Sequence, residues 1–87
     1  MPRFFFHVRD GLSAPDVNGT ILQSIDQART EAVRFAGEVI TQHAQNFWQR
    51  GEWALEVKSH DGLTLFVLHF GAVEAPVLSR PMEALLS

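Results

Sequence analysis

The stretch that most limits the possible folds of this chain is WALEVKSHDGLTLFVLHF, residues 53–70. Apolar and polar residues alternate on both sides of Asp61-Gly62, a pattern typical of a β-hairpin. A two-residue type I′ turn would place His60 opposite Leu63, so that the turn and the alternation predict the same register. The opposed pairs on one face would be Val57 with Phe66, Leu55 with Leu68, and Trp53 with Phe70.

Two further strands are predicted near the N-terminus. Residues 3–9, RFFFHVR, alternate with period two and place Phe4, Phe6 and Val8 on one face. Asp10-Gly11 is a turn signal, and after a polar stretch residues 20–22 are expected to pair back as an edge strand. The first half of the sheet is therefore a second hairpin.

Ser24 begins the most regular segment of the chain. Gln27 follows at the spacing of a capping box, in which each side chain bonds the other residue's backbone N–H. Apolar residues then recur at steps of three and four, which predicts a helix from Ile25 to about Asn46 or on to Gln49. The stripe contains Ile25, Ala28, Ala32, Phe35, Ala36, Val39, Ile40, His43 and Phe47.

This order of elements, ββαββ, predicts an α+β fold. A small antiparallel or mixed sheet carries one long amphipathic helix on the face of Phe4, Phe6, Leu55, Val57, Phe66 and Leu68, with strands one, three and four central. The 87 residues, 46% of them hydrophobic, suit one domain, which we place at residues 1–70. Residues 71–87 form a tail that is expected to pack on the domain or on a partner. Pro81 is expected to begin a short helix in that tail.

Charge and cysteine content exclude several classes of function. The net charge is −3 and the seven basic residues are scattered, so nucleic acid is not an expected partner. The chain has no cysteine, which excludes disulfides and thiolate metal sites. The N-terminal apolar run is shorter than the 7 to 15 or so residues of a signal-peptide core, and no run approaches the roughly 18 of a membrane span. A cytoplasmic protein without a membrane segment is expected.

The sequence offers no catalytic residue and no cofactor site. Its serines lack the flanking glycines of a nucleophile elbow, and Ser24 is better explained as a helix cap. Residues 16–20 begin like a calcium loop, but Gln27 stands where an EF-hand needs its twelfth-position glutamate. The sequence favours a protein that is not an enzyme.

The hairpin register also defines the opposite, outer face of the sheet. Phe5, Leu65 and Val67 make that face more apolar than a solvated face usually is. Three explanations are open: the tail covers the face, copies of the chain associate through it or an adjoining edge, or a ligand binds there. The candidate interface residues are Phe5, Leu65, Val67, Trp48, Trp53, Leu78, Met82 and Leu85.

Two smaller features add candidates. His7 and His69, with Glu56 nearby, are the start of a metal site on the same face, although their spacing is no known metal signature. Val33, Gly37, Ala44 and Trp48 form a second, narrower stripe on the helix, which we interpret as a widening of the core contact rather than a docking surface.

Several segments together resemble a family of small bacterial proteins known only as a domain of unknown function. They are the opening MPRFFFHVRDG, the loop Asp16-x-Asn18-Gly19-Thr20, a helix rich in alanine and arginine, and the tryptophan-led strand with its Asp-Gly turn. The resemblance covers residues 1 to about 70 and implies a compact cytoplasmic α+β domain, without any activity or catalytic residue.

The function predicted from these features is a non-enzymatic interaction or regulatory module that forms a homodimer or binds another protein. The alternative is a small ligand- or metal-binding protein that uses the face of His7 and His69.

Overall fold

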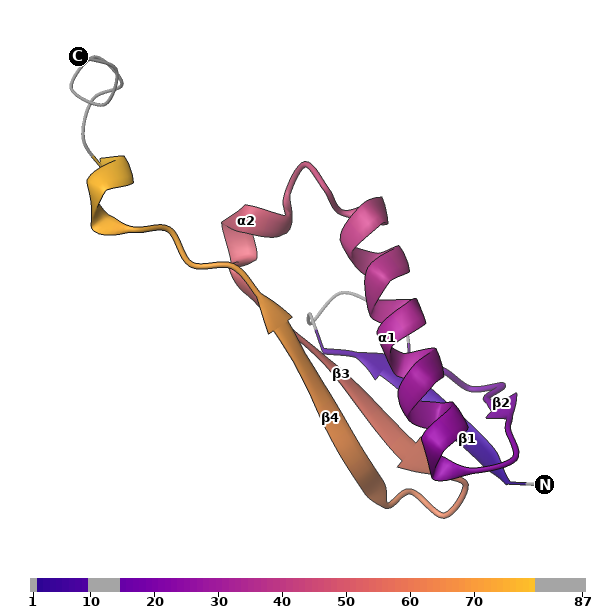
Figure 1. The fold of residues 1–87 in the computed structure, drawn as a ribbon. Coiled ribbons are helices and arrows are strands. Elements are labelled where there is room, and N and C mark those ends of the chain that lie inside the picture. Colours follow the sequence, from indigo (N-terminus) through magenta and orange to yellow (C-terminus); the bar gives the residue numbers. More distant parts are fainter. Residues whose placement is uncertain (1, 10–14, 80–87) are drawn as a thin grey trace.

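The computed structural model describes residues 2–9 and 15–79, and it shows a four-stranded sheet with one long helix across one face (Figure 1). All paired strands are antiparallel, in the order β2-β1-β3-β4. The predicted α+β class and ββαββ order are confirmed at this level. The elements are β1 Arg3–Val8, β2 Thr20–Ile21, α1 Ile25–Gln42, α2 Phe47–Arg50, β3 Glu52–Ser59, β4 Thr64–Gly71 and the 3-10 helix η1 Pro76–Ser79.

The core lies between α1 and the inner face of β1 and β3. Helix α1 turns small residues toward the sheet, so that its backbone approaches the strands closely, and Ala28 and Ala32 are fully buried. Burial of each large side chain opposite them contributes about 1.5–3 kcal/mol. The predicted core face is confirmed: Phe4, Phe6, Leu55 and Val57 are buried, while Phe66 and Leu68 pack half-buried against them.

Strand β4 lies at the edge of the sheet, so the prediction that strands one, three and four are central is wrong for β4. Strand β1 pairs with β2 on one side and with β3 on the other, so among residues 2–9 and 15–79 the one neighbour of β4 is β3. One long edge of the sheet therefore consists of β4.

Helix α1 ends at Gln42, earlier than predicted. At about 1.5 Å per residue its 18 residues span about 27 Å, close to the roughly 26 Å of the eight-residue strand β3, so a longer helix would overshoot the sheet. The His43 N–H bonds the Val39 carbonyl at 3.0 Å, and the chain then turns into α2. Gly51 ends α2 with a left-handed φ of 76°, a conformation that glycine adopts readily at the end of a helix.

The predicted hairpin register is confirmed, but the predicted type I′ turn is wrong. A positive φ occurs at Gly62 and not at Asp61, and the Ser59 N–H bonds the Leu63 carbonyl at 2.9 Å, which makes the loop three residues long. This offsets the pairing by one residue, so that Lys58 faces Thr64. A bulge next to Val57 restores the expected register.

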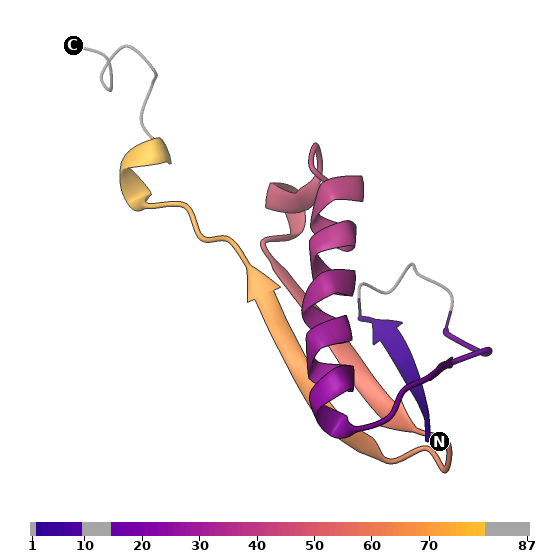
Figure 2. The ribbon, with the colours of Figure 1, turned by 45° about the vertical axis from the view of Figure 1, so that its right-hand side comes forward.

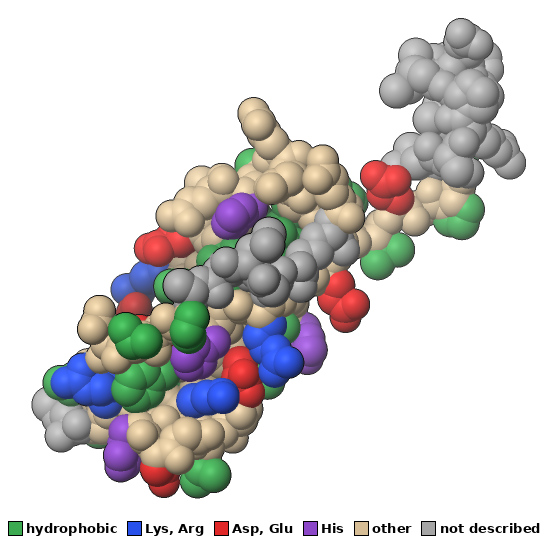
Figure 3. All heavy atoms as spheres, turned by 180° about the vertical axis from the view of Figure 1, so that it is seen from behind, with side chains coloured by type: hydrophobic (Ala, Val, Ile, Leu, Met, Phe, Trp, Pro, Cys, Tyr) green, Lys and Arg blue, Asp and Glu red, His purple; other side chains and the backbone are tan. Residues whose placement is uncertain are grey.

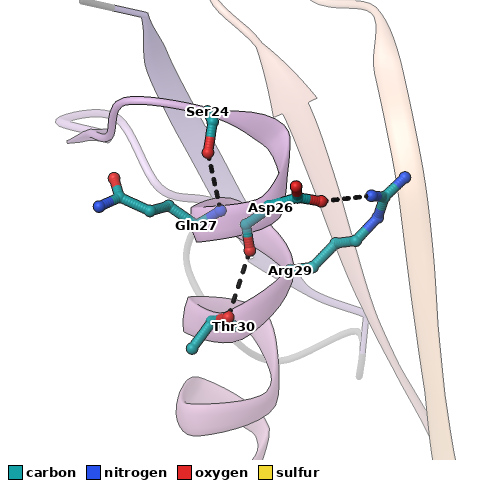
Figure 4. A network of polar contacts seen from close by, with 5 residues as sticks. All are labelled: Ser24, Asp26, Gln27, Arg29 and Thr30. Carbon is teal, nitrogen blue, oxygen red and sulfur yellow. Dashed lines mark hydrogen bonds and ion pairs between the residues drawn. The ribbon is translucent and has the colours of Figure 1, made fainter.

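The N-terminus of α1 is capped nearly as predicted (Figure 4). Ser24 Oγ accepts a hydrogen bond from the Gln27 backbone N–H at 3.1 Å, as a capping box requires. The Gln27 side chain, however, accepts from the backbone N–H of Gln23 at 2.7 Å rather than from that of Ser24. Asp26 lies in the first turn, where the helix dipole favours an anion, and pairs with Arg29 at 2.9 Å.

Beyond β4 the tail runs away from the sheet in both ribbon views (Figures 1 and 2). Val73 is 93% exposed, and up to Ser79 the tail leaves the outer face of the sheet uncovered. The short helix predicted from Pro81 lies outside the described residues. None of the helices in the described part of the chain is both long and apolar enough to cross a membrane.

Candidate functional site

Most of the predicted site residues lie on the outer face of the sheet, the side turned away from α1 (Figure 3). Hydrophobic, basic, acidic and histidine side chains are mixed there rather than separated. The face is therefore less uniformly apolar than the sequence suggests. The strand register pairs Phe5 with Lys58, His7 with Glu56, Glu56 with Val67, and Ala54 with His69.

Glu56 is the polar centre of this face. Its carboxylate accepts a hydrogen bond from Thr64 Oγ1 at 2.5 Å and pairs with Arg9 at 3.3 Å. Thr64 reaches it because the hairpin bulge turns Thr64 to the outer face, a shift that the alternating pattern does not reveal. The hydrogen bond from the Thr64 hydroxyl has the largest effect and lowers the pKa of Glu56. The positive charges of Lys58 and Arg9 lower the pKa further, and together these effects outweigh partial burial, which raises it. Glu56 is thus held as a carboxylate by its neighbours on the sheet.

The predicted metal candidates share this face but do not form a complete metal site. His7 Nδ1 accepts a hydrogen bond from the Asp16 backbone N–H at 3.2 Å, which engages one of its two ring nitrogens. His69 lies beside Ala54, one row away from Glu56. In residues 2–9 and 15–79, no three metal-ligating side chains are grouped to hold an ion. Ligand binding on this face stays a prediction.

An open hollow of about 410 Å³ lies at the end of this face, where Arg9, Glu52, Val67 and His69 line it.

The loop that begins at Asp16 is fastened to the edge of β1 by one carboxylate. Strand β2 is so short that it covers only the start of β1, and beyond it the Phe6 N–H bonds Asp16 Oδ2 at 3.1 Å. Asp16 Oδ1 accepts from the backbone N–H groups of Asn18 at 3.2 Å and Gly19 at 3.0 Å. The carboxylate therefore shapes its own turn and continues the sheet edge that β2 leaves open.

Gly19 allows this loop to lie close to β1. Its φ of 71° is left-handed, and a Cβ atom there would lie 2.8 Å from Arg3 Cγ and 2.9 Å from Phe5 Cε2. Partial burial raises the pKa of Asp16, but the hydrogen bonds from Gly19, Phe6 and Asn18 together outweigh it, and the pKa is lowered. The ionised carboxylate is the form that the fold stabilises.

This contact joins two segments that the sequence presents separately, the F-H pair of the opening and the Asp16-x-Asn18-Gly19 loop. These contacts were not predicted from the sequence. The Asp16 carboxylate accepts a hydrogen bond from the Phe6 backbone N–H, and the Asp16 backbone N–H donates one to His7 Nδ1. Asp and Asn before Gly are typical of a turn in which the Asp side chain bonds nearby backbone N–H groups. This pattern predicts the turn but not which part of the protein the turn packs against.

The two tryptophans named as interface candidates have different environments. Trp53 points from the inner face of β3 into the core, where it is 5% exposed and stacks on Phe47 with ring centroids 5.4 Å apart. Trp48 is 58% exposed and remains on the surface. Val33 is also 63% exposed, so the narrower helix stripe does not widen the core contact, and that interpretation is wrong.

The other six interface candidates are Phe5, Leu65, Val67, Leu78, Met82 and Leu85. Leu65 and Val67 are each 38% exposed and Phe5 is half-buried. Leu78 lies in η1. Met82 and Leu85 fall outside the described residues.

Comparison with known families matches residues 3–71 to a family described as a domain of unknown function, DUF6894. The matched range runs from β1 to the end of β4 and leaves the tail outside. Comparisons with curated proteins and with solved structures gave no match. Because the family covers most of the chain, the predicted resemblance to an uncharacterised family is confirmed at that level, and the chain belongs to the DUF6894 family.

Proposed function

We propose that this domain is a non-enzymatic interaction or regulatory module that associates with a second copy of itself. The observation that carries the proposal is the amount of apolar surface that the fold leaves open, since α1 covers only one face of the sheet. Single exposed apolar residues are ordinary on protein surfaces. Here the described part of an 87-residue chain exposes Val17, Ile21, Ile25, Val33, Ile40, Trp48, Leu63, Leu65, Val67, Val73 and Val77.

Self-association is compatible with the charge of the chain. A net charge of −3 opposes the approach of two copies only weakly at physiological ionic strength, where charges more than about 8 Å apart are largely screened. The ion pairs Arg9–Glu56, Arg29–Asp26 and Arg34–Glu31 are formed within one chain.

The setting that we propose is the cytoplasm of a bacterial cell. It is supported by the resemblance of the opening residues to small bacterial proteins. Fractionation of cells that express the protein from its own promoter tests this assignment.

Sedimentation equilibrium over protein concentrations of about 1 to 100 µM tests the proposed function. This range detects dimers with micromolar dissociation constants, which correspond to a binding free energy of about 8 kcal/mol or less. We expect the mass to rise from the 9.8 kDa of one chain toward twice that value as the concentration increases. A mass of one chain across the whole range would contradict self-association.

A further inference from the structure

We propose that the open edge of β4 is the surface of self-association, an inference that rests on the function proposed above. Two copies would join their β4 strands antiparallel around a two-fold axis at Leu68. The two four-stranded sheets would then continue as one eight-stranded sheet, with the α1 helices on the same face.

The backbone of β4 presents hydrogen-bonding groups to this edge. The Ala72 N–H bonds the Gly51 carbonyl across the ladder at 2.7 Å, so the even-numbered residues of β4 after the bulge direct their backbone groups toward β3. The N–H and C=O groups of Val67 and His69 therefore point away from β3. Nothing in residues 2–9 or 15–79 pairs with this side of the strand.

Strand β4 has a bulge at Leu65, near its start, but beyond it lacks the other features that usually protect an edge. Its eight residues, TLFVLHFG, contain no proline and no Asp, Glu, Lys or Arg. Natural edge strands are commonly very short, interrupted by proline, marked by lysine or covered by another element. The opposite edge, β2, is two residues long and continues into the Asp16 loop, so β4 is the long unprotected edge.

The side chains of β4 favour one register. With the axis at Leu68, Val67 lies opposite the partner's His69, and each of the two such pairs exchanges two main-chain hydrogen bonds. On the inner face Leu68 meets the partner's Leu68, and Phe66 meets the partner's Phe70, an aromatic cross-strand pair of the kind that stabilises sheets. An axis at Val67 would instead place Phe66 opposite Leu68 and lose both aromatic pairs.

The inner side of the edge is apolar as well. Phe35 lies against Phe6 of β1, with ring centroids 6.3 Å apart, so the opposite flank of α1 is turned toward β4. That flank carries Val33 and Ile40, which are 63% and 41% exposed, as well as Arg29, which pairs with Asp26. Together with the half-buried inner side chains of β4, Val33 and Ile40 form an apolar surface that stops at the edge and that a second copy would extend.

The composition of β4 does not oppose its pairing with a second copy. The strand contains no Asp, Glu, Lys or Arg, so two β4 edges can meet without bringing like charges together.

A proline at Val67 tests the edge without removing an internal hydrogen bond, because the Val67 N–H points outward. We expect Val67→Pro to weaken dimerisation at least about tenfold in sedimentation equilibrium, with far-UV circular dichroism unchanged. Val67→Lys should weaken it as well and serves if the proline variant does not fold. Val17→Lys, the same change at an exposed valine beside the opposite edge of the sheet, should leave the dissociation constant within about twofold.

A single introduced cysteine tests the register, since the chain has no other thiol. Leu68→Cys would place two thiols opposite each other at a non-hydrogen-bonded pair, where side chains approach most closely. Mild oxidation should link this variant into a disulfide dimer much faster than Val17→Cys, an exposed control beside the other edge.

The outcomes separate the two proposals. A dimeric wild type whose Val67 variants associate as tightly as Val17→Lys would overturn the β4 interface and leave self-association standing. A dimer in which Leu68→Cys links no faster than Val17→Cys would overturn the proposed register. A wild type that stays monomeric would overturn both proposals.

Discussion

Replacing Trp53 by alanine should lower the free energy of unfolding by about 3–5 kcal/mol, the range for loss of a large buried aromatic side chain. Trp53 stacks on Phe47 and packs against Phe70 and His43, with ring centroids 5.3–6.3 Å apart. Its indole N–H also bonds the Phe47 carbonyl at 3.3 Å, so the substitution leaves a cavity and removes one of the two hydrogen bonds that this carbonyl accepts, the other coming from the Gly51 N–H. Because domains of this size have about 5–15 kcal/mol of stability, much of the protein's stability depends on this residue.

Trp48→Ala is the matched control, since it makes the same change five residues earlier at a side chain that is 58% exposed. We expect it to change the free energy of unfolding by about 0.5 kcal/mol or less. Urea denaturation followed by circular dichroism, at a concentration where the protein is monomeric, measures both variants. Equal losses for the two tryptophans would contradict the assignment of Trp53 to the core.

Replacing Asp16 by alanine should cost about 2–3 kcal/mol, because hydrogen bonds to a charged group contribute more than neutral ones and a part-buried N–H group of β1 would lose its partner. The three donors are the backbone N–H groups of Phe6, Asn18 and Gly19. Urea denaturation of wild type and variant at pH 7 measures the difference.

The same variant should change how stability depends on pH. The pKa of Asp16 is lowered in the folded protein, so its contribution is complete above the ordinary carboxyl pKa of about 4 and is lost as the pH falls through the lowered value. The stability gap between wild type and Asp16→Ala should therefore be widest near neutral pH and shrink in acid.

Asp26→Ala is the control for Asp16, since the Asp26 side chain is 89% exposed and takes part in one surface ion pair with Arg29. Its expected cost is about 0.5–1 kcal/mol, from the ion pair and the helix dipole. A cost for Asp16→Ala no larger than this, or a gap that does not change with pH, would contradict the role given to the Asp16 carboxylate.

Local pattern was enough to predict the fold class, the inner face and the pairing of β3 with β4. It was not enough for the turn, because Asp61-Gly62 suits both a two-residue turn and a three-residue turn in which only Gly62 needs positive φ. The end of α1 was also missed, since the apolar stripe continues through His43 and Phe47 while the length of the sheet sets where the helix stops.

The candidate site was predicted less completely, for a physical reason. The alternation of β3 and β4 identifies the outer-face residues. It does not reveal that Thr64 joins them through a bulge, nor that in the described part of the chain β4 pairs on one side alone. The hydrogen bond between the Phe6 N–H and the Asp16 carboxylate joins positions ten residues apart. The local sequence predicts the turn at Asp16, but it does not predict which strand the turn will contact.

Amide hydrogen exchange at Val67 and His69, followed by NMR at increasing protein concentration, tests the central claim most directly. Both N–H groups point to the open edge, so they should exchange rapidly in the dilute monomer and become protected as the dimer forms. The Leu68 N–H, which points toward β3, serves as the internal reference and should be protected throughout. If Val67 and His69 remain unprotected at concentrations where sedimentation shows a dimer, the β4 edge is not the interface.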